Sequence, residues 1–228
     1  GAGSVRNLLV TIDGPAGAGK TTVSRALADR LGYRYVDTGA LYRGVAYAAA
    51  RRGVAPDADA GLSGMLEGLR LNFLPGPSGQ RLTADGLDIS DAIRSPEISM
   101  LASAVSARAV VRAFLLRVQH ELGRQKAAVF EGRDMGTVVF PEADVKFFLN
   151  ASAQTRAQRR FAEIGAAAGV SIEAVERDMQ RRDLQDSTRA LAPLKAAADA
   201  VAIDSTDLSI DQVVERMLAH VRAVLERG

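Results

Sequence analysis

A loop suited to hold phosphate groups lies near the start of the chain. Residues 14–21 read GPAGAGKT and match the pattern G-x-x-x-x-G-K-[ST]. They follow an apolar stretch, residues 8–13, which predicts a strand ending at Asp13. Glycines after a strand let several backbone N–H groups point inward at phosphate oxygens. The sequence therefore predicts a binding site for a nucleoside triphosphate.

Two side chains after the last glycine complete this predicted site. We expect Lys20 to reach the outer phosphates and the Thr21 hydroxyl to ligate Mg²⁺, while the helix that begins near Lys20 adds its positive dipole end. A plain turn of small residues is the structural alternative, but such a turn does not require Lys and Thr at these two positions. The predicted contacts to the triphosphate are Gly14, Pro15, Ala16, Gly17, Ala18, Gly19, Lys20, Thr21 and Thr22.

Three further polar clusters are candidates for chemistry. Residues 36–43 (VDTGALYR) offer Thr38 as a helix cap and Arg43 one turn later, and residues 130–137 (FEGRDMGT) place two carboxylates and an arginine at a strand end. Residues 181–189 (RRDLQDSTR) form a basic segment after a helix. Each has a structural alternative: a plain helix start, an ion pair and a solvated charged loop respectively. The first two follow predicted strands, where ligands bind in parallel sheets.

Short apolar runs alternate with helical patterns along the chain. Strands are predicted at residues 8–13, 34–37, 127–131, 145–150 and 200–204, and helices at 20–31, 40–52, 60–69, 103–124, 153–164, 171–183 and 209–226, with Ser171 and Ser209 as N-caps. This alternation predicts an α/β fold of the P-loop NTPase type, a five-stranded parallel sheet flanked by helices. Residues 71–98 differ, because turns rich in Pro and Gly separate short apolar runs. They predict a small antiparallel β insert.

Composition excludes several classes of function. The 228 residues include no cysteine and two histidines, His120 and His220, which excludes disulfides and thiolate catalysis and argues against a zinc site. Both histidines are expected on helix surfaces. The formal charge of +2, the scattered basic pairs and the few aromatic residues give little support for nucleic-acid binding. Without an apolar run long enough for a membrane helix, we expect a cytoplasmic protein.

Read in order, these clusters resemble the bacterial cytidylate kinases, the (d)CMP kinases among the nucleoside monophosphate kinases. The resemblance rests on residues 12–21, 37–43, 132–141, 192–194 and 203–206, and on Arg182 and Asp183 with Asp186 and Arg189. These positions are distributed over nearly the whole chain. The resemblance implies a single kinase domain over residues 5–228, in which residues 71–98 bind the monophosphate and residues 156–189 form a lid. It also implies a monomer, and the composition predicts binding to neither nucleic acid nor membrane.

The family implies transfer of the γ-phosphoryl group of ATP to CMP or dCMP, with Mg²⁺. Lys20, Arg133 and Arg189 match its catalytic positions. The matched contacts to CMP are Thr38, Arg43, Ser103, Arg112, Arg133, Asp134, Arg182, Asp186 and Arg189. Thr21 would hold the metal directly and Glu131, where many relatives carry Asp, through a water. A structural ion pair is the alternative for Glu131, and Asp13 has no assigned role.

Three points stay open at this level. Arg156, Arg159 and Arg160 are equivalent candidates for a lid contact to ATP. Another small-molecule kinase on the same core, such as a thymidylate, adenylate or shikimate kinase, would share the phosphate loop but not Ser103, Arg112 and Asp134. A GTPase-like switch would need Asn-Lys-x-Asp, and none of the four lysines lies in that context.

Overall fold

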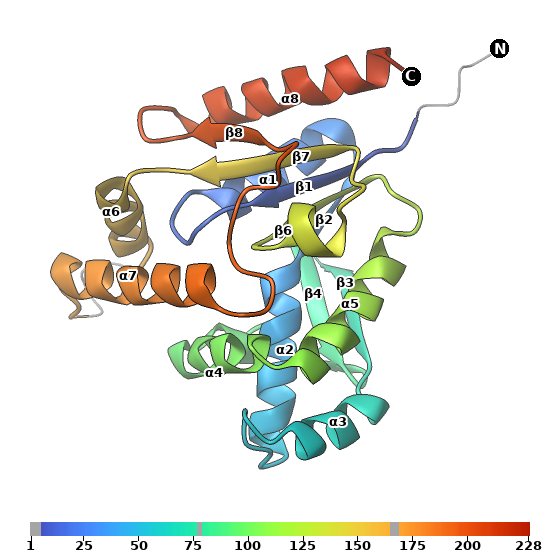
Figure 1. Ribbon diagram of the computed structural model, residues 1–228, viewed down its shortest axis with the longest axis vertical. Helices are drawn as coiled ribbons and strands as arrows, with labels where there is room; N and C mark the ends of the chain where they lie inside the picture. The colour runs from blue at the N-terminus through green and yellow to red at the C-terminus, as the bar shows by residue number, and fades with distance from the viewer. Residues whose placement is uncertain (1–5, 77–78, 165–168) are drawn as a thin grey trace. The chain divides into compact units, whose positions relative to one another are not determined.

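The computed structural model describes residues 6–76, 79–164 and 169–228 and contains two compact units (Figure 1). The first unit comprises Gly1–Val36 and Gln125–Gly228, and the second comprises Asp37–Arg124. We describe each unit by itself. The first contains the phosphate loop, and the second contains the predicted β insert.

The first unit is organised around a five-stranded parallel sheet with strand order β2-β6-β1-β7-β8, as predicted. The strands are β1 (Leu9–Asp13), β2 (Arg34–Asp37), β6 (Ala128–Gly132), β7 (Val145–Asn150) and β8 (Val201–Asp204). Strand β1 is central and buried along its whole length. Asp13 lies level with Gly132 of β6 and Phe148 of β7, so the segments that leave these three strands begin at one edge of the sheet.

Helices α1 (Lys20–Leu31) and α8 (Ile210–Glu226) pack against this sheet. Their apolar sides, including Leu27 of α1 and Met217 of α8, share one core with Val10 of β1 and Phe147 of β7. Ser209 begins α8 with a capping box, as its Oγ accepts from the Gln212 N–H at 3.1 Å while the Gln212 side chain accepts from the Ser209 N–H. The N-cap predicted from the sequence is confirmed.

Two further helices of this unit, α6 (Ala153–Ile164) and α7 (Ile172–Thr188), lie side by side (Figure 1). Their shared core is small and consists of Ala157, Val175 and Met179, with Phe161 packed against it. Ser171 caps α7, accepting from the Ala174 N–H at 3.2 Å. Most other side chains of the two helices face solvent, and α7 continues five residues beyond the predicted end at residue 183.

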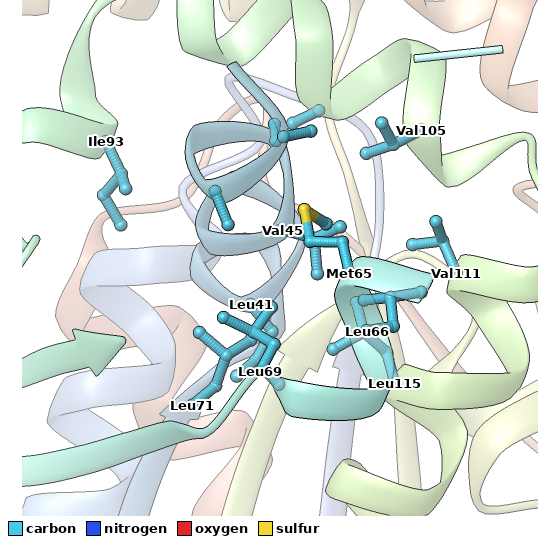
Figure 2. Close-up of a cluster of buried hydrophobic side chains, with 14 of the residues drawn as sticks. Leu41, Val45, Met65, Leu66, Leu69, Leu71, Ile93, Val105, Val111 and Leu115 are labelled. Atoms are coloured by element: carbon cyan, nitrogen blue, oxygen red, sulfur yellow. The ribbon is translucent and has the colours of Figure 1, made fainter. Parts of the chain in front are cut away.

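The described part of the second unit contains four α-helices, a 3-10 turn and a small sheet. The elements are α2 (Thr38–Arg51), α3 (Asp59–Gly68), β3 (Leu71–Gly76), β4 (Gly79–Ala84), β5 (Leu87–Asp88), a 3-10 turn (Ala92–Arg94), α4 (Pro96–Ser106) and α5 (Ala109–Gly123). Strands β3, β4 and β5 form the predicted antiparallel sheet. Leu41 and Val45 of α2 meet Leu66, Leu71 and Leu115 in a separate core (Figure 2).

The single helix predicted over residues 103–124 is wrong. Helix α4 already begins at Pro96, capped by Ser95, and α5 begins at Ala109 after a bend of 99°. The break occurs because Arg108 has extended backbone angles (φ −91°, ψ 127°) and its guanidinium donates to both oxygens of Asp59 at 2.8 and 2.7 Å. Continuous helical periodicity across residues 103–124 did not reveal this tertiary contact.

Among the residues described, no single helix is long and apolar enough to cross a membrane. Helices α4 and α5 meet the length and composition criteria only together, as a pair with that 99° bend.

Candidate active site

The phosphate loop passes so close to neighbouring backbone that only glycine fits at two positions. A Cβ on Gly14 (φ 155°) would lie 1.9 Å from the carbonyl oxygen of Leu149 at the end of β7. A Cβ on Gly17 (φ 74°) would lie 2.7 Å from the carbonyl oxygen of Arg156 in α6. The loop is therefore fixed by the sheet on one side and by α6 on the other. The predicted role of glycine in the turn agrees with this geometry.

Lys20 is buried at the start of α1 and turns back over the loop. Its Nζ donates to the carbonyl oxygen of Pro15 at 3.0 Å, and the residue is 8% exposed. Burial, together with the positive charge of Arg133, lowers the pKa of Lys20 to about 8, and nearby carboxylates oppose the shift. A bound anion would stabilise a buried ammonium at this place. The outer phosphates of the triphosphate are expected to supply that anion.

Glu131 is held between two hydroxyl groups. Thr21 Oγ1 donates to Glu131 Oε1 at 2.8 Å, and the Tyr35 hydroxyl donates to Oε2. Mg²⁺ prefers oxygen ligands and keeps waters and phosphate oxygens in its coordination shell. The Thr21 hydroxyl and the buried Glu131 carboxylate, side by side at the phosphate loop, fit that requirement. Within the described ranges, no group of three or more His, Cys, Asp or Glu could hold a metal.

Two predicted arginines flank one carboxylate. Arg133, after β6, pairs with Asp186 Oδ2, and Arg189, just past α7, approaches Asp186 Oδ1 at 3.9 Å. Arg189 Nε also donates to the carbonyl oxygen of Ala192 at 2.7 Å. Burial lowers the pKa of the neighbouring Arg182, with a further contribution from Arg160. Positive charge is thus concentrated where an anion could compete with Asp186.

Two of the three candidate lid arginines contact the backbone of the phosphate loop. Arg156 donates to the carbonyl oxygen of Ala16 at 3.3 Å and pairs with Asp183 at 2.8 Å. Arg159 donates to the carbonyl oxygen of Ala18 at 3.3 Å and to both the hydroxyl (2.9 Å) and carbonyl oxygen (2.8 Å) of Ser205.

The third candidate, Arg160, pairs with Glu163 of its own helix at 3.2 Å and is partly exposed. The structure therefore distinguishes Arg156 and Arg159 from Arg160, which the sequence did not.

Two buried aspartates lie at the strand ends beside the loop. Asp134 follows Arg133 and begins a π-helical turn (Met135–Val139), an element that the sequence did not predict. Asp13, at the end of β1, accepts hydrogen bonds from the Met135 and Gly136 N–H groups at 2.9 and 2.8 Å. Burial raises the pKa of Asp13 to about 6, against the lowering effect of these two bonds.

In the second unit, Thr38 is not the cap of α2. Asp37 is the N-cap, since its Oδ1 accepts from the Ala40 N–H at 3.2 Å, and Thr38 is the first helical residue and is buried. Asp and Thr both make good caps. A cap at Thr38 would start the helix at residue 39, whereas α2 starts one residue earlier, at Thr38 itself. Asp37 Oδ2 also accepts from Arg43 at 3.2 Å. Arg43 is thereby oriented by the capping carboxylate.

Arg112 and Ser103 lie on neighbouring helices of the second unit. Arg112 of α5 donates to the carbonyl oxygen of Ser106 at 3.0 Å, and its guanidinium lies 5.4 Å from the centre of the Tyr42 ring. Ser103 is half-buried on α4, and its carbonyl oxygen accepts from Ser106 Oγ at 2.7 Å. Asp134, their predicted partner in reading a base, belongs to the first unit. That three-residue site stays a prediction.

The sequence of this chain is similar to that of known proteins over most of its length. The sequence model of the family described as Cytidylate kinase matches residues 10–223. The chain belongs to the cytidylate kinase family. It is 54% identical to a cytidylate kinase of Geobacter sulfurreducens over 95% of this chain and 94% of the relative. It is 47% identical to a cytidylate kinase of Geobacter sp. strain M21, over 97% and 95%.

A solved gluconokinase from Sinorhizobium meliloti has the same general fold. The two chains superpose with a TM-score of 0.50 at 14% identity, and 97% of each chain is covered. At this identity the likeness supports the architecture of the sheet and helices alone. The resemblance to cytidylate kinases drawn from the sequence is confirmed by the family match, and the P-loop kinase fold agrees with the structural neighbour.

In this member of the cytidylate kinase family, several residues beside the predicted site carry little signal in the sequence. Tyr35 carried no signal, because it lies in a strand whose pattern does not point to Glu131. Ser205 belongs in the sequence only to the motif at residues 203–206, yet it is buried and bonded to Arg159. Asp37 could have been found from its preference for helix caps. Asp13 was noted without a role, since its partners are backbone groups that no side-chain pattern marks.

Proposed function

We propose that this protein is a (d)CMP kinase that transfers the γ-phosphoryl group of ATP to CMP and dCMP, giving ADP with CDP or dCDP. The match of the family over residues 10–223 carries this proposal. The phosphate loop supports it, because Lys20 and the pair of Thr21 with Glu131 provide a cation and oxygen ligands at one place.

The donor site is proposed to hold ATP along residues 14–22. The backbone N–H groups would bind phosphate oxygens, and Lys20 would exchange its bond to Pro15 for the transferring group. Mg²⁺ would neutralise charge between the β- and γ-phosphates. Thr21 would hold that ion directly, and Glu131 would orient a water bound to it.

The acceptor phosphate is proposed to bind Arg43, Arg133 and Arg189. Each of these arginines already contacts a carboxylate, Asp37 or Asp186, that a phosphate could replace. The attacking oxygen belongs to an ionised phosphate, so no general base is required. Catalysis then depends on positioning and on the charge that Lys20, Arg133 and Arg189 place near the transferred group.

Cytosine is proposed to be read by Asp134, with Arg112 and Ser103. The exocyclic amine of cytosine is a donor that a carboxylate accepts, whereas uracil presents an oxygen at that position and would be repelled. Thr38 belongs to the same proposed acceptor set, and Arg182 and Asp186 are the proposed contacts to the sugar. These contacts come from the matched family positions.

Three parts of the proposal concern organisation. We propose that the whole of residues 5–228 acts as one kinase domain, with residues 71–98 as the monophosphate-binding insert. Residues 156–189 are the proposed lid, which would exclude water as a competing nucleophile. The proposed partners are nucleotides alone, without nucleic acid or membrane, and the enzyme is proposed to act as a cytoplasmic monomer.

The acceptor spectrum tests this function. ADP production is measured with Mg²⁺-ATP and CMP, dCMP, UMP, AMP, GMP, dTMP or shikimate in turn. We expect strong turnover with CMP and dCMP, weak turnover with UMP and a negligible rate with the others. Preference for another acceptor would leave a P-loop kinase of different specificity, and hydrolysis without transfer would leave only a nucleotide-binding protein.

Substitution of Asp134 tests the reading of the base. Asp134→Ala should reduce the ratio of kcat/KM for CMP over that for UMP by about tenfold or more, since one buried charge-assisted contact discriminates the two bases. The internal control is KM for ATP, measured from ADP production, which should be the same in the variant and in the wild type. An unaltered CMP to UMP ratio would remove Asp134 from the base site.

A further inference from the structure

The carboxylate of Asp13 is buried beside the phosphate loop and has no part in the function proposed above. It lies at the last position of β1, one residue before Gly14, and is 4% exposed. Its two oxygens accept from two successive backbone N–H groups, Oδ1 from Met135 at 2.9 Å and Oδ2 from Gly136 at 2.8 Å. The end of β1 is thus bonded to the segment that immediately follows Arg133 and Asp134.

These two N–H groups begin the π-helical turn Met135–Val139. The first N–H groups of a helical turn have no partner within it and require a cap. Asp134 occupies the N-cap position with φ −133° and ψ 24°, but its side chain makes no cap hydrogen bond. Its carbonyl oxygen instead accepts from the Val138 and Val139 N–H groups at 3.0 and 3.1 Å. Asp13 therefore does the capping from a neighbouring strand, and the carboxylate of Asp134 is not used for it.

The turn is also held by close packing. A Cβ on Gly136 would lie 3.1 Å from Cδ of Lys146, 3.2 Å from Oγ1 of Thr11 and 3.4 Å from Oδ2 of Asp13. At the other end of the turn, Lys146 Nζ donates to the carbonyl oxygen of Pro141 at 2.5 Å and to Asp199 at 2.9 Å. Asp13 fixes the beginning of the turn, and Lys146 fixes the segment after it.

The charge of Asp13 strengthens both bonds. Although burial raises the pKa of Asp13 to about 6, the carboxylate is ionised at neutral pH, and hydrogen bonds to a charged acceptor are stronger than neutral ones. The charged groups around it are Asp134, which raises the pKa, Lys20, which lowers it, and the stem of Lys146 packed on Gly136. Replacing the carboxylate by an amide would turn one acceptor into a donor facing an N–H.

We propose that Asp13 is a positioning residue that sets the backbone of Arg133 and Asp134 for the acceptor nucleotide. This rests on the proposed function, in which Arg133 binds the acceptor phosphate and Asp134 reads its base. The phosphate loop itself is fixed by the β1 ladders and by the approach of Gly14 to Leu149. The loss of Asp13 should therefore affect CMP more than ATP.

The test compares two aspartates near the two ends of β1: Asp13 is its last residue, and Asp144, just before β7, bonds to its first residue. Asp13→Asn is the test variant, and Asp144→Asn is the matched control, because Asp144 Oδ2 accepts from the Leu9 N–H at 2.8 Å at the opposite end of β1. In Asp13→Asn we expect KM for CMP to rise about tenfold and the CMP to UMP ratio to fall, with KM for ATP within about twofold of its original value. Asp144→Asn should lower thermal stability and leave all three quantities unchanged.

A second variant acts from the other side of the contact. Gly136→Ala keeps the N–H donor but crowds Cδ of Lys146 and Oγ1 of Thr11, so the start of the turn must shift relative to Asp13. The same rise in KM for CMP is expected at smaller size, and this variant decides the matter if Asp13→Asn does not fold. Equal changes for CMP and ATP, or an unchanged CMP to UMP ratio, would overturn the proposal. If the wild-type protein does not phosphorylate CMP, the proposed function fails instead. Hydrogen exchange at the Met135 and Gly136 amides then still tests whether Asp13 holds the turn. The exchange should be faster in Asp13→Asn than in Asp144→Asn.

Discussion

The phosphate loop and helices α6 and α7 of the proposed lid lie in the same unit but are stabilised in different ways. The loop follows a fully buried strand, and its path is set by backbone contacts such as that of Gly14 with Leu149. Helices α6 and α7 share only a small apolar core, and Arg156 and Arg159 bond them to the loop carbonyls of Ala16 and Ala18. Contacts between cations and carbonyl oxygens can be exchanged for phosphate, whereas the glycine contacts cannot. The structure thus combines a loop fixed by backbone contacts with two helices whose contacts to that loop can be exchanged.

The largest effect is expected from breaking the fixed part. Gly14→Ala would place a Cβ 1.9 Å from the carbonyl oxygen of Leu149, so the loop must move. We expect kcat/KM for ATP to fall by at least about a hundredfold, because displacements of about 1 Å have this effect on positioned groups. Gly64→Ala in α3 is the control, since its Cβ meets nothing within 4 Å. Retained activity in Gly14→Ala would show that the loop is not fixed by β7.

A smaller loss is expected from the exchangeable part. Arg159→Ala removes the bonds to Ala18 and Ser205, and kcat/KM for ATP should fall about tenfold, as expected for loss of a charge-assisted contact. Arg181→Ala is the matched control on the same pair of helices, because Arg181 is exposed and pairs only locally with Asp178 among the contacts described. Equal losses in both variants would indicate that the lid acts through its overall charge.

The pH dependence of kcat/KM for ATP, which reports on the free enzyme, should differ from that of kcat, which reports on the enzyme with ATP bound. Burial lowers the pKa of Lys20 to about 8, so the free enzyme loses this charge as pH rises through 8, and kcat/KM for ATP should then decline about tenfold per pH unit. Bound phosphates favour the ammonium, so kcat at saturating ATP should decline only at higher pH. Lys20→Arg, which stays charged, should remove the decline in kcat/KM at a lower maximal rate. Coincident declines in wild type would contradict this assignment.

The smallest effect on activity is expected from the lid core. Met179→Ala should accelerate hydrogen exchange in α6 and α7 and change the main unfolding transition little, whereas Met217→Ala in the sheet core should lower Tm by several degrees. A bisubstrate analogue that joins adenosine and cytidine through phosphates should restore protection of the lid helices. No change in the exchange of residues 156–189 on binding would remove the lid from the account.

The sequence predicted the phosphate loop well because its determinants are local. Glycines, Lys20 and Thr21 follow a strand at fixed spacing, and the strand, helix α1 and the five-stranded sheet were found where expected. The break between α4 and α5 could not be predicted in the same way, since it depends on a pair between Arg108 and Asp59.

Side-chain partners that are backbone groups were the least predictable part of the site. Arg156 and Arg159 could not be chosen over Arg160, because every residue offers a carbonyl oxygen and no pattern marks Ala16 or Ala18. For the same reason, Asp13 had no role until its two N–H partners were seen. Asp37 and Thr38 are neighbours and both suit a helix cap, so a difference of one residue in the start of α2 decides which of them is the N-cap.

Transfer of labelled phosphate tests the central claim most directly. The protein is incubated with ATP labelled at the γ-phosphate, Mg²⁺ and CMP or dCMP, and the labelled products are separated. Recovery of the label in CDP or dCDP, dependent on the acceptor and lost in Arg133→Ala, is the predicted result. Label released as inorganic phosphate at a rate that CMP does not alter would contradict the account.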